Sequence, residues 1–189
     1  MADLNFSQGA DPVAIYNDLS GNQLVVNSDG SINTQALLNY EVGQDKVFSL
    51  SGNFTAAVGG ADNPIFMIKN PSGSGKTMKI RRLRVGCAVT NVIVEFKIFY
   101  APTITLNGTS QTPRNNLIGS STASAMTAFS LPTLSVLGTQ ILDVVIGQNS
   151  AAPVYETSLN VQANQTVVIT AAPASNNRAV TIDVMWAEV

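Results

Sequence analysis

Residues 78–100 have the sequence MKIRRLRVGCAVTNVIVEFKIFY, and this stretch decides the fold class. Apolar residues occupy alternate positions, first as Met78 and Ile80 and then, one position out of step, from Leu83 onwards. Such alternation predicts β-strands with one buried face. The change of step falls at Arg81-Arg82, where a β-bulge would insert one extra residue. We therefore predict a bulged strand followed by a second strand.

Similar short runs of β-branched and aromatic residues recur on both sides and are separated by Gly, Pro, Asn and Ser. This spacing predicts an all-β protein, an antiparallel sandwich or barrel. Residues 101–153 carry a weaker pattern, in which 120–128 suggest a short helix and 139–146 a further strand. The other predicted strands cover residues 47–50, 54–58, 64–69, 159–161, 166–170 and 179–186.

Residues 1–45 differ from the rest of the chain and are predicted to form an extended N-terminal arm, with the β-sandwich domain over 46–189. Glycine, proline and Asp-Gly break this segment, and its apolar residues come in short groups such as 24–26. A segment of this kind gains little by folding on itself. We expect it to lie along its own domain or a neighbouring subunit, and a disordered tail is the alternative.

Composition excludes several classes of function. Of 189 residues, 45% are apolar and 12% are charged, the net charge is −2, histidine is absent, and Cys87 is the one cysteine. A Ser-His-Asp triad, a histidine-ligated zinc and a disulfide within the chain are therefore excluded. We expect no enzymatic activity and no cofactor. No apolar stretch is long enough to span a membrane, and the N-terminus lacks the features of a signal peptide.

Residues 70–77, NPSGSGKT, resemble a nucleotide-binding P-loop. The motif requires a glycine where this chain has Asn70, and a helix must follow it so that backbone N–H groups meet the phosphates. A strand pattern follows Thr77 instead. We interpret the segment as a glycine-rich turn, and a nucleotide-binding enzyme that uses Lys76 and Thr77 is the alternative.

Six of the ten basic residues fall within 69–84. Arginine recognises anionic groups well, yet no aromatic residues alternate with these cations as single-stranded nucleic acid would require. A protein–protein contact is therefore favoured over nucleic acid. The candidate partner-binding residues are Lys79, Arg81, Arg82 and Arg84.

Other residue types that can carry chemistry are scattered. The carboxylates occur singly and predict no catalytic pair. Cys87 lies in the apolar phase of its strand and is predicted to be a small buried hydrophobe. Trp186 is predicted to lie in the core or in an interface.

A surface with so few charges suits a protein that stays in contact with neighbours in an assembly. Three strings resemble segments of small structural proteins of tailed-bacteriophage virions. They are IKNPSGSGKTMKIRRLRV at 68–85, NSDGSIN at 27–33 and TPRNNLIGSS at 112–121. The resemblance implies a jelly-roll-like β-sandwich that forms a homotrimer and decorates or cements the capsid. Its implied partner is the lattice of the major capsid protein, on the surface of the virion, after synthesis in the host cytoplasm.

Under this interpretation, we expect the trimer contacts on the strand face with Phe96, Ile98 and Tyr100, or around Trp186. Neither a membrane nor nucleic acid is an expected partner. The alternative is a receptor- or carbohydrate-binding module of a tail fibre or baseplate. A sugar site would need exposed aromatic residues beside Asp or Asn, and only 6% of the residues are aromatic.

Overall fold

The computed structural model describes residues 42–57, 62–87, 93–147, 154–175 and 177–189, together with two short strands nearer the N-terminus. These are β1 (Val13–Tyr16) and β2 (Gln23–Val26), which pair with each other in antiparallel fashion. The rest of the predicted arm up to residue 41 lies outside the described residues.

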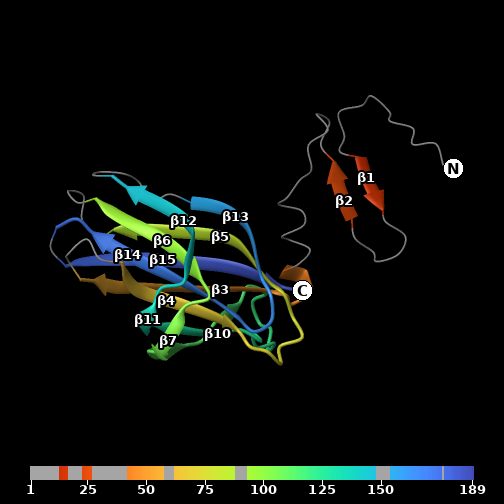
Figure 1. The fold of residues 1–189 in the computed structure, drawn as a ribbon. Helices are drawn as coiled ribbons and strands as arrows, with labels where there is room; N and C mark the ends of the chain where they lie inside the picture. The colour runs from red at the N-terminus through yellow and green to blue at the C-terminus, as the bar shows by residue number, and fades with distance from the viewer. Residues whose placement is uncertain are drawn as a thin grey trace.

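Eight long strands build the body of the protein (Figure 1). They are β3 (Val47–Ala56), β4 (Asn63–Asn70), β5 (Met78–Cys87), β6 (Val94–Tyr100), β12 (Thr139–Ile146), β13 (Val154–Val161), β14 (Gln165–Pro173) and β15 (Arg178–Glu188). Five short strands lie between β6 and β12. They are β7 (Thr103–Leu106), β8 (Thr109–Gln111), β9 (Arg114–Asn115), β10 (Thr127–Ser130) and β11 (Thr133–Val136).

The long strands form two antiparallel sheets that pack face to face. One sheet has the order β13-β5-β15-β3-β9 and the other β12-β6-β14-β4-β10-β8. Along the chain, every connection between long strands crosses from one sheet to the other except that from β6 to β12, which are neighbours in one sheet. This is the eight-stranded jelly roll, with β7 to β11 as an insertion. The predicted antiparallel, jelly-roll-like β-sandwich is confirmed.

Alternation along the strands supplies the core, as the sequence predicts. On β15, Val180, Ile182, Val184 and Trp186 are buried in one cluster with residues of the facing sheet. The Trp186 ring stacks on Phe48 of β3, with ring centroids 6.4 Å apart. Burial of such large side chains stabilises a fold by roughly 1.5–3 kcal/mol each.

The predicted bulge in β5 is present. Met185 of β15 lies opposite Arg82, but the next residue, Trp186, lies opposite Ile80, so Arg81 is the extra residue. The extra residue lets the apolar side chains on both sides of the bulge face the same core. This single insertion explains the change of step in the sequence.

Two predicted elements differ from the structure. Residues 120–128 do not form a helix, because Thr127 and Ala128 already belong to β10, which pairs with β4. The runs 47–50 and 54–58 are not separate strands. The backbone of Gly52 pairs with Ile182 between them, and β3 continues through.

The expected trimer contacts are wrong for three of the four residues named. Phe96, Ile98 and Trp186 are buried in the core of their own protomer, so they are not available to another subunit. Tyr100, the last residue of β6, is exposed. Sequence alternation identified a buried face correctly, but tertiary packing assigned that face to the intramolecular core.

Candidate partner-binding surface

The basic residues of β5 lie on the outer face of the five-stranded sheet. Because Leu83 and Val85 point into the core, the alternating Arg82 and Arg84 point away from it. Before the bulge, Lys79 alternates with the buried Ile80 in the same way. The structure therefore brings Lys79, Arg82 and Arg84 to one face, whereas the fourth predicted residue, Arg81, is the half-buried extra residue of the bulge.

Neighbouring strands set the charge around these side chains. Asp183 lies opposite Arg84 and forms an ion pair with Arg82, with 3.8 Å between Arg82 Nη2 and Asp183 Oδ2. The two side chains are 39% and 27% exposed, so solvent screens this pair and it contributes little to stability. Glu156 of β13 lies opposite Arg82 on the other side. Cations therefore outnumber carboxylates on this face.

Arg114 extends the same face and was missed by the sequence analysis. It lies in β9, the edge strand beyond β3, where it pairs with Ser49. Ser49 in turn pairs with Met185, and Met185 with Arg82, which puts Arg114 in the same cross-strand row as Arg82. The two arginines are 32 positions apart in the sequence (114 − 82), so no local sequence pattern indicates that they share a face.

A shallow hollow of about 390 Å³ opens on this face. Arg84 and Asp183 border it, and the backbone of Gly86 forms part of its wall. Cys87, predicted to be buried, is only half-buried and lines the hollow. The hollow offers a place for a partner side chain between a cation and an anion.

The segment that resembles a P-loop is a turn between β4 and β5. The side chain of Asn70 is buried and donates hydrogen bonds to the backbone oxygens of Lys76 (2.8 Å) and Val161 (2.9 Å). Ser74 Oγ donates to Asn70 Oδ1 at 2.5 Å. A strand follows the turn, as predicted, so it lacks the helix N-terminus that a P-loop provides for phosphates.

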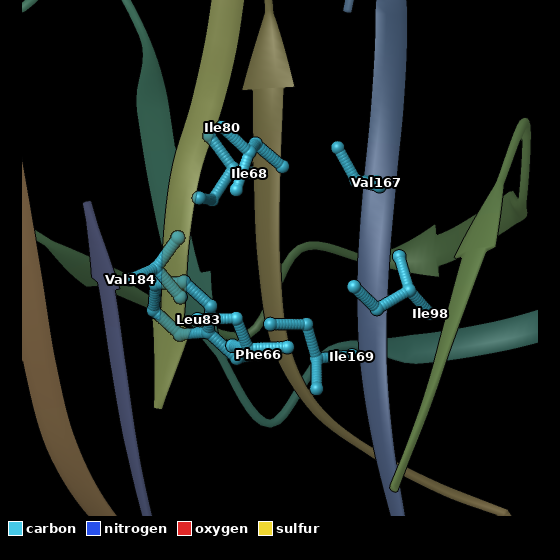
Figure 2. Close-up of a pocket in the computed structure, with 8 residues that line it drawn as sticks. All are labelled: Phe66, Ile68, Ile80, Leu83, Ile98, Val167, Ile169 and Val184. Atoms are coloured by element: carbon cyan, nitrogen blue, oxygen red, sulfur yellow. The ribbon is translucent and has the colours of Figure 1, made fainter. Parts of the chain in front are cut away.

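The space between the sheets is filled by side chains. Figure 2 shows eight apolar residues from both sheets, among them Phe66, Leu83 and Ile169, around a void of about 10 Å³. A void of this size holds at most about one water molecule. This part of the interior therefore has no room for a ligand.

Three charged residues meet on the outer face of the six-stranded sheet. Lys97 Nζ lies 3.0 Å from Glu95 Oε2 and 3.2 Å from Asp62 Oδ1. The hydrogen bond from Lys97 to Glu95 raises the pKa of the lysine above its ordinary value, and Asp62 adds to the effect. Partial burial acts in the opposite direction. The arrangement is an ion-paired cluster.

Within the described ranges, no three His, Cys, Asp or Glu side chains come together as metal ligands would. Nor does that part of the chain contain a helix with the length and hydropathy needed to cross a membrane.

Comparison with known proteins yields weak structural similarity alone. No protein-family model and no curated protein matches the sequence. Among solved structures, the chain is similar to the "Crystal structure of infectious bursal disease virus VP2 subviral particle". The identity is 11%, the TM-score is 0.19, and the match covers 99% of this chain and 49% of that chain. The chain thus spans about half the length of that viral protein, and the jelly-roll assignment rests on strand topology.

Proposed function

We propose that this chain is a structural protein of a bacteriophage virion, which decorates or cements the capsid by binding the lattice of the major capsid protein. The observation that carries the proposal is a basic outer sheet face on a jelly roll, a fold used by viral capsid domains among others. Two of the strings that resemble virion proteins belong to this face: the string at 68–85 contains most of β5, and the string at 112–121 contains β9.

The basic face would meet an acidic patch of the capsid subunit. Arg84 is exposed, and no ion pair or hydrogen bond of its side chain is found within the described residues, so its charge is available to a partner. Charged groups at such a surface raise the rate of encounter and select the orientation of docking. Under this proposal the chain has a binding role, with no catalytic step and no cofactor.

The proposal includes a homotrimer on the capsid surface. Its subunits would meet through the side of the sandwich where β12 and β13 are edge strands. Val145 of β12 is 61% exposed and Val154 of β13 is 53% exposed, so both apolar side chains would be removed from water by contact with another subunit. A trimer would present three basic faces to the lattice, so that contacts with several capsid subunits add avidity.

Charge reversal at one exposed arginine tests capsid binding. Arg84→Glu should lower co-sedimentation with capsids assembled from the major capsid protein by roughly tenfold, because the face loses a cation and gains an anion. Lys76→Glu makes the same change in net charge at an exposed position in the turn before β5. It should leave binding within about twofold of the unmodified protein.

Two results would overturn this proposal. One is that the unmodified protein does not sediment with capsids at low or physiological salt. The other is that the two variants bind equally well, which would show that the basic face takes no part in the contact.

A further inference from the structure

The two long sides of the sandwich differ. On one side, the short strands β8 and β9 of the insertion cover the edges of both sheets. On the other side, the eight-residue strands β12 and β13 form the two edges (Figure 1). Between them lies a groove of about 340 Å³, and its lining brings together the end of β6, the start of β12 and the turn from β13 to β14.

One aromatic ring is accessible in this groove. Tyr100 ends β6 and is 44% exposed, with Ile141 and Leu159 also in the lining. The backbone around Tyr100 is held in place from several sides. It pairs with Val167 of β14 and with Thr139 of β12. The ring is thus attached to a rigid part of the sheet.

The polar part of the lining consists of amides and a hydroxyl. Asn160, Gln162, Gln165 and Thr166 contribute it, and no charged residue lines the groove. Each amide offers both donors and an acceptor. Gln162 Oε1 accepts a hydrogen bond from Thr77 Oγ1 at 3.2 Å, which orients its amide. The side chains of Asn160 and Gln165 have no hydrogen-bond partner among the residues that the structure describes.

We propose that this groove binds a neutral saccharide. A pyranose ring has a face of C–H groups and a rim of hydroxyls that both donate and accept hydrogen bonds. The face would pack against Tyr100, and the rim would contact the amides of Asn160 and Gln165. The volume of the groove fits a ligand of this kind, since small-molecule sites usually occupy 300–1,000 Å³. A phosphorylated or acidic ligand would find no cation here. This inference does not depend on the proposed capsid contact, which uses another face. The proposed trimer contact uses the same side of the sandwich, but Val145 near the end of β12 and Val154 at the start of β13 lie at the opposite end of these strands from the groove.

The experiment titrates the full chain with a panel of neutral oligosaccharides built from glucose, galactose and N-acetylglucosamine, followed by calorimetry and saturation-transfer NMR. At least one oligosaccharide should bind. Tyr100→Ala should weaken binding at least roughly tenfold, whereas Tyr100→Phe, which keeps the ring, should stay within about threefold. Gln165→Ala should weaken binding, and Gln44→Ala, an exposed glutamine outside the groove, should not. Unchanged melting temperatures would show that the variants fold.

Four outcomes would overturn the proposal. They are no binding of any neutral oligosaccharide at millimolar concentration, binding unaffected by Tyr100→Ala, preference for sialylated over neutral oligosaccharides, and protection of Tyr100 from solution labelling by a second copy of the chain. The last outcome would identify the groove as a subunit interface. Capsid binding by Arg84 variants is measured separately, so failure of one proposal leaves the other testable.

Discussion

Glu188 shows how a single buried residue joins distant parts of this fold. Its carboxylate accepts hydrogen bonds from the Ser124 hydroxyl, the backbone N–H of Ala125 at 2.9 Å and the Trp186 indole N–H at 3.0 Å. A buried carboxylate is stable when donors surround it in this way. The sequence marked Trp186 as core or interface but gave no reason to expect this partner.

Glu188→Gln should destabilise the protein. The variant replaces a carboxylate oxygen by an NH₂ group, which faces N–H and O–H donors and cannot accept their hydrogen bonds. We expect a loss of about 2 kcal/mol, equivalent to a fall of about 4–8 °C in Tm. Thermal unfolding measures the change in Tm, and Glu156→Gln, at an exposed position, is the control. Equal melting temperatures for the two variants would contradict the role assigned to Glu188.

Lys97 gives a prediction that depends on pH. Glu95 and Asp62 raise the pKa of Lys97 in the folded protein above its ordinary value of 10.5. The pairing therefore stabilises the fold fully below pH 10.5, and this stability is lost as the pH rises through the folded pKa. Lys97→Met should be less stable than the unmodified protein at pH 8 in urea unfolding. The difference should shrink above pH 10.5, and a difference that is independent of pH would argue against the pairing.

At the scale of elements, the insertion between β6 and β12 depends on glycines near its two ends. Gly138 has φ of +92°, and a Cβ there would lie 2.1 Å from the backbone oxygen of Tyr100. Gly108 has φ of +83° and a similar approach to the oxygen of Ser130. Only glycine adopts such φ values at no steric cost, and only a residue without Cβ fits so close to another strand.

Gly138→Ala should therefore destabilise the protein by at least about 2 kcal/mol, since backbone strain alone costs about 1–3 kcal/mol and the clash adds to it. Gly73→Ala is the matched control, because a Cβ at Gly73 meets nothing within 4 Å. Urea denaturation of both variants checks the prediction. If Gly138→Ala is as stable as the control, the prediction is wrong, and the insertion shifts to accommodate a Cβ without a loss of stability.

Elements with a local sequence signature were predicted correctly, and the element that depends on long-range contacts was not. The strand over 139–146 and the bulge at Arg81-Arg82 have a local signature in the alternation of apolar residues, and both were predicted. Residues 120–128 are rich in Ser and Ala, and they are held by contacts with β4 and with Glu188. Those contacts join positions about sixty residues apart, so a local sequence pattern does not predict them.

At the scale of the whole molecule, self-association is the property to measure. Light scattering at two concentrations should give a stable mass of three protomers of 19.8 kDa each if the proposed trimer is present. Val145→Lys places a charge on the open edge and should dissociate the assembly at low concentration. Val136→Lys changes a residue of similar exposure (56%) in the insertion and should not. A monomeric unmodified protein would contradict the trimer.

The sequence by itself determined the all-β class, the buried face of most long strands, the bulge, and the basic character of β5. Each of these depends on residues that are neighbours along the chain, because side chains alternate between the two faces of a strand. Tertiary structure alone decided which edges pair, that Phe96 and Trp186 belong to the core of their own protomer, and that Arg114 joins the basic face. It also placed Tyr100 beside the amides of the β13–β14 turn. These features arise from contacts between distant segments, and a local pattern does not encode which segments meet.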